Sequence, residues 1–348
     1  ASAALVGSPA ERKGIGPETV LPVRQDTPAA RARTLRPRTR SASSVSSAKS
    51  WLIPPIDGTK SIATGMTRAT FVASCSAPEG MSEDQFCDYL VEELRQKILD
   101  LGPDNVAAFF AEPILGSGGV IVPPEGYNRR TWELCREHDI LYVADEVVTA
   151  FGRLGHWFVS KDMFDIEPDI ITCAKGLTSA YLPLGAMIVS DRIYDVLGND
   201  ADRWFTAGFT YSAHPVCCAA ALKNIEILER EKIFDNVREV GAYFEEQLHT
   251  LLDLPIVGDI RGRLFMMCVV NVMNKETREF FPPEVNIGKR ISDHCEALGF
   301  MVRPASDQNS MSPALIMSKE DVYYVVSRLR QAIERTMDDL RQEGFLPA

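Results

Sequence analysis

Short, wholly apolar runs separated by amphipathic helical segments constrain the fold of this chain most strongly. A capping-box pair, Ser82 and Gln85, begins the first helical segment. The apolar runs lie at 106–111, 140–144, 170–174 and 186–189. Strands that are buried on both faces lack polar alternation, so these runs are typical of a parallel sheet covered by helices. The sequence therefore predicts an α/β fold with a mostly parallel sheet and helices on both faces.

The pattern changes after Pro255. A longer strand-like run at 263–272 comes first, followed by a helix at 285–298, a strand at 300–303 and a final helix from Ser318 to about 341. This mixture predicts a smaller α+β C-terminal domain. We therefore divide the chain into an atypical N-terminal segment, a partial large domain and a small domain, at 1–78, 79–250 and 251–348.

The N-terminal segment has its own composition. No acidic residue occurs from Thr27 to Ile56, arginines crowd between 31 and 40, and a serine cluster follows at 41–50. The segment shows neither the helical nor the strand-like spacing of apolar residues, which predicts a segment without regular structure. An organelle transit peptide, a linker and a disrupted reading frame all fit this composition. Because the chain begins at Ala1 without methionine, we rank a fragment or a disrupted start above a transit peptide.

Charge and cysteine content exclude several classes of protein. The formal net charge of -11 argues against a nucleic-acid partner, and no apolar run is long enough to span a membrane. The eight cysteines form no CxxC pair, which favours reduced thiols in a cytoplasmic protein. Cys135 and His138 lie three apart, but two ligands do not make a site, so we predict no metal. The glycines of 116–120 lack GxGxxG spacing, which argues against dinucleotide binding.

Charged residues follow three of the apolar runs, namely Glu112, Asp145 and Lys175. Ligands of open parallel sheets bind outside the carboxyl ends of the strands. A charge directly after a buried strand is costly unless it is paired or functional. A functional site at this edge is one reading of Asp145 and Lys175, and a structural ion pair between them is the other.

Pyridoxal phosphate would give this pair a chemical reason. That cofactor needs a lysine amine for its aldehyde and an acidic partner that keeps its pyridine nitrogen protonated. A partly desolvated lysine loses its proton more easily, so it can attack and later move a proton. The phosphate needs hydroxyls and backbone N–H groups near a helix start. Thr210 lies shortly before the helix that Pro215 begins.

Six stretches carry a resemblance to a known family. They are AEPILGSGGVIVPPEGY from Ala111, LYVADEVVTAFGRLG from Leu141, PDIITCAKGLTSAYLPLGAMIVS from Pro168, FTYSAHPVCCAAAL from Phe209, GDIRGRLFMMC from Gly258 and GFMVRP from Gly299. In this order they resemble class III aminotransferases of pyridoxal-phosphate fold type I over residues 105–348. The likeness is strongest to the omega branch, which moves amino groups between amines or omega-amino acids and pyruvate.

The resemblance implies a role for each matched residue. Lys175 would be the Schiff-base lysine and Asp145 the partner of the pyridine nitrogen. Val147 would pack on the ring face, with an ordinary core position as the alternative. Thr210 would contact the phosphate of the neighbouring subunit's cofactor, which implies a homodimer. Glu112 would either orient groups near the site or be structural.

Two arginine positions bear on the substrate. Arg303, expected after a strand at 300–302, would match the mobile arginine that recognises a substrate carboxylate. A solvated surface arginine is the alternative. Ser310 stands where ornithine- and aminobutyrate-type relatives carry an arginine, which favours the branch that uses amines or omega-amino acids.

The family's phosphate loop and Tyr-His-Gly motif are not found ahead of these stretches. Residues 1–8 resemble the segment just after that motif, the likeness fails from 9 to 78, and it resumes near Gly80. We therefore expect a truncated fold type I transaminase that moves an amino group from an amine or omega-amino acid to a keto acid such as pyruvate. A catalytically impaired homologue that acts through dimerisation is the alternative, and a racemase or aminomutase ranks third.

Overall fold

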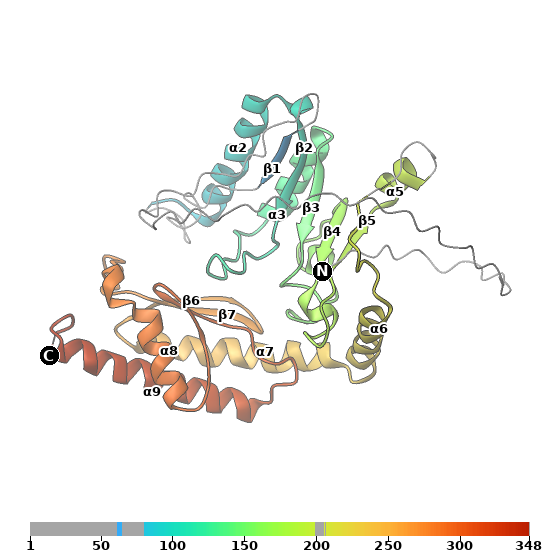
Figure 1. The fold of residues 1–348 in the computed structure, drawn as a ribbon. Coiled ribbons are helices and arrows are strands. Elements are labelled where there is room, and N and C mark those ends of the chain that lie inside the picture. Colours follow the sequence, from blue (N-terminus) through green and yellow to red (C-terminus); the bar gives the residue numbers. More distant parts are fainter. Residues whose placement is uncertain (1–60, 65–79, 199–204, 206, 348) are drawn as a thin grey trace, which may run out of the picture.

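The computed structural model describes residues 80–198, 205 and 207–347, together with the backbone of residues 61–64. The first of its two sheets has five strands in the order β1-β2-β3-β4-β5 (Figure 1). They are β1 (Ser61–Thr64), β2 (Val106–Ala111), β3 (Leu141–Asp145), β4 (Ile170–Cys173) and β5 (Ala186–Val189). The strands β1 to β4 are parallel and β5 is antiparallel to β4. The expected mostly parallel sheet is confirmed.

The helices α2 (Glu83–Leu101) and α3 (Tyr127–Glu137) pack against this sheet. The expected capping box is confirmed, since Ser82 Oγ accepts from the backbone of Gln85 while the Gln85 side chain accepts from the backbone of Ser82. Behind it, Phe86 and Leu90 of α2 join one buried cluster with residues of β2 and β3. This packing holds β2 and β3 in place.

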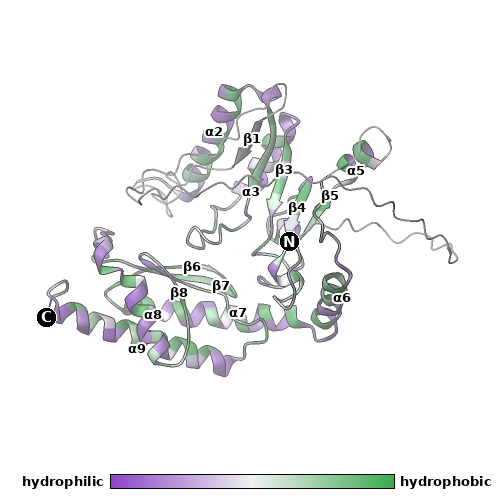
Figure 2. Ribbon diagram, in the orientation of Figure 1, coloured by the Kyte–Doolittle hydropathy of each residue, from purple (hydrophilic) through white to green (hydrophobic). Residues whose placement is uncertain are grey.

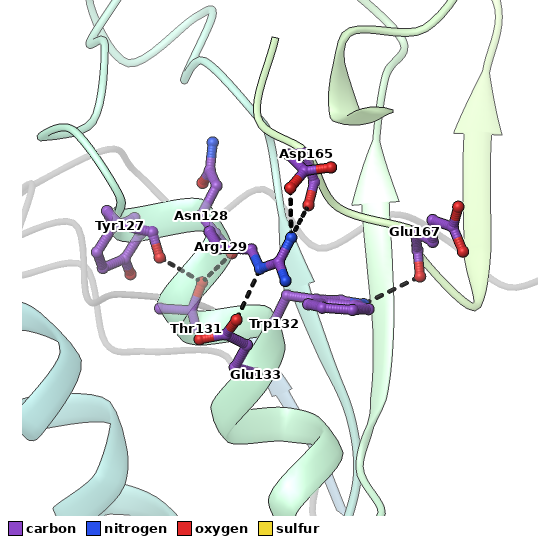
Figure 3. A network of polar contacts seen from close by, with 8 residues as sticks. All are labelled: Tyr127, Asn128, Arg129, Thr131, Trp132, Glu133, Asp165 and Glu167. Atoms are coloured by element: carbon purple, nitrogen blue, oxygen red, sulfur yellow. Dashed lines mark hydrogen bonds and ion pairs between the residues drawn. The ribbon is translucent and has the colours of Figure 1, made fainter. Parts of the chain in front are cut away.

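Polar contacts tie α3 to the segment that leads into β4 (Figure 3). Arg129 donates to Glu133 Oε1 at 2.7 Å and to the side chain of Asp165 at 2.5 Å. Trp132 donates through Nε1 to the carbonyl oxygen of Glu167 at 2.9 Å. The guanidinium carbons of Arg129 and Arg136 lie 5.0 and 5.1 Å from the Trp132 ring centre, within the range of cation–π attraction. The start of β4 is therefore anchored to α3.

The second sheet is antiparallel, with the order β6-β7-β9-β8. Its strands are β6 (Val257–Arg263), β7 (Met266–Asn271), β8 (Arg303–Ala305) and β9 (Gln308–Met311). Packed with it are α7 (Ile233–His249), α8 (Ile287–Ala297) and α9 (Lys319–Gln342). The mixed green and purple of α9 in Figure 2 reflects its one buried side, which includes Val322, Leu329 and Ile333. The expected smaller α+β part is thus present, while a boundary near residue 250 stays a prediction.

The remaining α-helices of the described chain are α4 (Val159–Asp162), α5 (Asp191–Gly198) and α6 (Pro215–Arg230). Turns of 3-10 helix lie at Pro103–Asn105, Lys175–Leu177, Thr250–Asp253 and Pro283–Val285. Within the described ranges, none of the helices combines the length and the apolar character that a membrane crossing demands.

Two strand predictions in the small domain have wrong bounds. The run at 263–272 contains all of β7 but begins with the last residue of β6 and a hairpin turn, because Leu264 takes a left-handed backbone (φ 47°) and turns the chain between β6 and β7. Both turn residues are apolar and Phe265 is fully buried, so hydropathy hid the turn. The strand expected at 300–303 begins only at Arg303. The residues before Arg303 instead form the exit from α8. There Gly299 has a left-handed backbone (φ 90°) and Phe300 N donates a hydrogen bond to Cys295 O.

The N-terminal prediction needs one correction. Residues 61–64 form β1, a parallel edge strand beside β2, inside the segment expected to lack regular structure. A four-residue edge strand is too short to produce a readable hydrophobic period. The rest of that segment, including the arginine and serine clusters, lies outside the described residues.

Candidate active site

Three charged residues gather where β2, β3 and β4 end. The last pair of the β2–β3 ladder is Ala111 with Ala144, so the next residues, Glu112 and Asp145, lie beside each other. Lys175 follows two residues after the end of β4, the strand next to β3. We call Glu112, Asp145 and Lys175 the carboxyl edge. The structure therefore brings together the residues that the sequence singled out for their positions after strands.

Lys175 sits in a tight turn, with a left-handed backbone at φ 40° and an exposed side chain. The turn closes through a bond from Leu177 N to Ala174 O at 2.9 Å. At Gly176 a Cβ atom would come within 2.9 Å of Phe151 Cβ, so a larger residue does not fit without displacement. A left-handed residue other than glycine is uncommon, and such strain concentrates at functional sites.

Asp145 is half-buried at the end of β3. Its Oδ1 accepts a hydrogen bond from the backbone N–H of Val147 at 3.0 Å. Val147, expected against the ring of a cofactor, is half-buried two residues later. The bond holds Asp145 in one orientation and leaves Oδ2 without a hydrogen-bond partner among the described residues. A fixed carboxylate of this kind can orient a protonated ring nitrogen.

The charges of both Asp145 and Lys175 affect the pKa of Glu112. Burial raises the pKa of its carboxyl above the ordinary value, and a hydrogen bond from Gly116 N at 2.8 Å opposes that rise. The negative charge of Asp145 raises this pKa further, whereas the positive charge of Lys175 lowers it. All three members of the carboxyl edge therefore lie close enough to interact electrostatically.

Glu146 is a buried carboxylate that sequence reasoning missed. Its Oε1 accepts from Ser160 N at 2.8 Å and Ser160 Oγ at 2.5 Å, and its Oε2 accepts from Val159 N at 3.0 Å and Thr149 Oγ1 at 2.8 Å. Three of these four bonds tie the residue next to Asp145 to the start of α4, and the fourth joins it to Thr149. The available signal was the second acid of the DEV stretch, a charge too close to a buried strand to be solvated.

Thr210 lies in an exposed turn before α6. A hydrogen bond from Phe209 N to Ser212 Oγ, 2.8 Å long, closes the turn. The aromatic neighbours of Thr210, Phe209 and Tyr211, are 72% and 75% exposed. Within the described chain no hydrogen bond or ion pair joins Thr210 to Glu112, Asp145 or Lys175.

Arg303 belongs to a row of residues that crosses the small sheet. The ladders pair Arg261 with Cys268, Cys268 with Ser310, and Ser310 with Arg303. Directly paired residues of antiparallel strands point to the same face of a sheet. Cys268 lies in one buried cluster with Ile114, which follows β2 of the large sheet. This face of the small sheet is therefore turned toward the large domain. Arg303 is exposed at the end of the row.

Two contacts hold the small sheet near the carboxyl edge. Arg153, in the loop after β3, donates to the carbonyl oxygens of Phe265 at 3.0 Å and Pro313 at 2.6 Å. Burial lowers the pKa of this guanidinium to about 10. At Gly116, which donates to Glu112, an added Cβ would lie 3.5 Å from Met266 Cε of β7. The two sheets therefore meet beside Glu112.

The chemistry of this donor set fits pyridoxal phosphate at two points. Lys175 offers an amine, and Asp145 offers a half-buried, oriented carboxylate on the neighbouring strand. The charges of Lys175 and Asp145 both act on the carboxyl of Glu112, which follows the next strand, β2. Among the described residues, no three side chains of His, Cys, Asp or Glu form a group that could hold a metal ion.

Comparison with known proteins identifies the family. The model of class-III aminotransferases matches residues 44–333. That match begins well before Gly80, so the likeness extends further toward the N-terminus than the motifs indicated. Gamma-aminobutyrate transaminase 1 of Oryza sativa subsp. indica is 41% identical over 259 residues, covering 74% of this chain and 50% of the relative. Putrescine--pyruvate aminotransferase of Pseudomonas aeruginosa is 41% identical over 257 residues, covering 74% and 56%.

A solved structure agrees. An (S)-enantioselective omega-transaminase from Thermomicrobium roseum superposes with a TM-score of 0.72 at 40% identity, covering 75% of this chain and 58% of the other. The chain spans roughly half the length of the curated relatives it matches. Family model, relatives and fold agree on one conclusion: the chain belongs to the class III aminotransferases.

Proposed function

We propose that this chain is a pyridoxal-phosphate transaminase that moves an amino group from an amine or omega-amino acid to a keto acid such as pyruvate. The observation that carries the proposal is the carboxyl edge, where Lys175 and Asp145 follow neighbouring strands and both act on Glu112. The names of the two relatives support this substrate class, because one names putrescine and pyruvate and the other names gamma-aminobutyrate.

The residues divide the work as follows. When bound, pyridoxal phosphate supplies an aldehyde that reacts with amines and a ring that withdraws electrons. Lys175 holds the aldehyde end through Nζ and moves the proton at the reacting carbon of the substrate. Asp145 keeps a proton on the ring nitrogen, and Val147 packs against the ring. Glu112 helps to orient these groups.

A homodimer follows from the same proposal. Thr210 contacts the phosphate of a cofactor held by a second copy of the chain. Its exposed turn, with Phe209 and Tyr211 largely uncovered, supports a surface that a second copy buries. Sedimentation equilibrium of the purified chain tests this step, since a strictly monomeric protein with full activity would contradict it.

Arg303 is proposed to bind the carboxylate of a keto acid or omega-amino acid. Its planar fork matches a carboxylate in two parallel hydrogen bonds. Ser310, the residue opposite it, supplies no second guanidinium. Amines without a carboxylate therefore do not depend on Arg303.

We further propose a reducing, cytoplasmic location. All seven cysteines of the described ranges are free thiols, and six of them are buried. Free thiols persist in compartments that keep thiols reduced. Recovery of the protein with the cytosolic fraction of the source cells tests this assignment.

Covalent labelling tests the function itself. The purified chain is incubated with pyridoxal phosphate, reduced with borohydride and mapped by peptide mass spectrometry, with alanine formation from pyruvate assayed in parallel. We expect label on Lys175 and amino transfer from putrescine or gamma-aminobutyrate. Lys175→Ala should abolish both, whereas the exposed Lys223→Ala of α6 serves as the matched control.

The outcomes separate the alternatives. Label on a different lysine, or amino transfer by Lys175→Ala, would refute the assignment of Lys175. Label on Lys175 without amino transfer would favour a homologue that holds the cofactor but does not turn over.

A further inference from the structure

The turn that carries Lys175 is held by one side chain of α6, that of Asn224. Its Nδ2 donates to the carbonyl oxygen of Gly176 at 2.9 Å and to that of Leu177 at 3.2 Å. Its Oδ1 accepts from Ser179 Oγ at 2.8 Å. An amide side chain has two N–H donors and a carbonyl acceptor. In Asn224 both the N–H donors and the carbonyl oxygen are hydrogen-bonded to residues 176–179.

The left-handed backbone of this turn has to be stabilised by contacts from other parts of the chain. Lys175, Ser179 and Ala180 all have left-handed backbones, at φ 40°, 48° and 63°. L-residues disfavour that region, and they persist in it only where surrounding structure over-determines the conformation. Phe151 packs against Gly176 and so supplies one such contact. Asn224 supplies the other, directly on the two peptide groups after Lys175.

We propose that Asn224 is a positioning residue for amino transfer, which keeps the Lys175 turn left-handed and so keeps the lysine amine at the carboxyl edge. The inference rests on the proposed role of Lys175. It assigns to Asn224 no contact with substrate or cofactor. Two carbonyl oxygens must be met by one group that carries two N–H bonds, so an amide is required and a carboxylate of the same shape cannot serve.

The chain contains a matched control. Asn236 of α7 is also half-buried, and its Nδ2 donates to the carbonyl oxygens of Leu315 at 2.8 Å and Met317 at 3.2 Å. These bonds match those that Asn224 makes to carbonyls in number and type and agree with them in length to within 0.1 Å, but they hold the segment before α9. A similar loss of stability is therefore expected in Asn224→Ala and Asn236→Ala, whereas only Asn224→Ala should also disturb the Lys175 turn.

The test compares Asn224→Ala, Asn224→Asp and Asn236→Ala in the full chain. The rate at which pyridoxal phosphate becomes borohydride-trappable on Lys175 is measured by peptide mapping. We expect Asn224→Ala and Asn224→Asp to slow this rate roughly 5- to 30-fold, the factor that matches the strain of one left-handed residue. Asn236→Ala should label within about twofold of the parent, as expected for a change without partners at the site.

Amide hydrogen exchange gives a readout that needs no cofactor. Asn224→Ala should speed exchange in peptides covering 174–181 and leave those covering 314–318 unchanged, and Asn236→Ala should do the reverse. Equal labelling rates in Asn224→Ala and Asn236→Ala would overturn the inference, as would unchanged exchange at 174–181 in Asn224→Ala. If the parent chain takes no label at Lys175, the proposed function fails first, and the exchange result still decides whether Asn224 holds the turn.

Discussion

Arg303 lies directly opposite Ser310 in the outer ladder of the small sheet. The same row of paired residues continues to Arg261, whose side chain is only 14% exposed and whose Nε donates to Asp259 Oδ2 at 2.8 Å. The two arginines of one row thus differ in their surroundings. Arg303 is exposed, and its guanidinium has no hydrogen bond or ion pair within the described part of the chain. An unengaged guanidinium can bind an incoming carboxylate without first breaking another contact.

Arg303→Ala should therefore weaken reactions of substrates that carry a carboxylate. Losing a hydrogen bond to a charged group costs about 1.5–3 kcal/mol, or roughly 10- to 150-fold in kcat/KM. Half-reactions with pyruvate and with an amine that lacks a carboxylate, followed by stopped-flow absorbance, measure the difference. Arg261→Ala is the control, since its partner is already Asp259 and its loss should lower stability. Equal losses for both substrates in Arg303→Ala would point to a structural arginine.

Glu146→Ala should destabilise the fold more than any exposed carboxylate does. The change leaves four donors around Val159, Ser160 and Thr149 without their acceptor. A buried unsatisfied donor costs about 1–3 kcal/mol, and the losses do not add fully, so we expect at least about 3 kcal/mol. Urea unfolding of the cofactor-free chain measures this, with the exposed Glu284→Gln as control.

Glu146→Gln refines the same prediction. An amide keeps one oxygen but turns an N–H group toward two of the four donors, so we expect an intermediate loss. A Glu146→Gln chain as stable as the parent would mean that the carboxylate charge contributes nothing at this position.

The strands and the carboxyl edge could be predicted because each has a local signal. A parallel strand buried on both faces is a continuous apolar run, and the charge that ends it is visible at Glu112, Asp145 and Lys175. Their meeting at one edge then follows from sheet geometry alone. The capping box at Ser82 and the helix start at Ser318 are equally local signals, and the structure contains both.

Other features depend on distant parts of the chain. Asn224 meets the Lys175 turn across 45 or more residues, and nothing around it in α6 marks it as special. The hairpin turn at Leu264 and Phe265 is apolar because its residues pack into the core, which contradicts the usual polar signature of turns. The roles of Val147 and Thr210 stay predictions, since they concern groups that the chain by itself does not contain.

Glu112 should make the cofactor-free fold less stable as the pH rises. Burial raises the pKa of its carboxyl in the folded state, so the folded chain binds the proton more tightly than the unfolded chain. The resulting stability is fully present below the unfolded pKa of about 4.3 and is lost as the pH climbs through the raised folded pKa. Glu112→Gln removes this titration and keeps an oxygen for Gly116 N.

The urea midpoints of the parent and of Glu112→Gln measure the effect between pH 4 and pH 8. We expect the variant to gain stability relative to the parent as the pH rises through this window. A difference that is constant with pH would show that the Glu112 carboxyl titrates alike in the folded and unfolded chains.

Asp145→Asn should separate catalysis from folding. Asparagine keeps an Oδ1 acceptor for the bond from Val147 N, which is 3.0 Å long, so the backbone after β3 retains its support. It loses the negative charge that, in the proposed function, keeps a proton on the ring nitrogen of the cofactor. Removing one oriented electrostatic partner of a reacting group costs about 10²- to 10³-fold in kcat.

Asp145→Ala is the companion variant, because it loses both the charge and the bond to Val147. We therefore expect Asp145→Asn to unfold in urea within about 0.5 kcal/mol of the parent, as a substitution that keeps its contacts does, and Asp145→Ala to be less stable. Single-turnover amino transfer to pyruvate should fall in both. Normal turnover in Asp145→Asn would refute the role of Asp145, whereas equal unfolding of Asp145→Asn and Asp145→Ala would mean that the bond to Val147 contributes little to the loop.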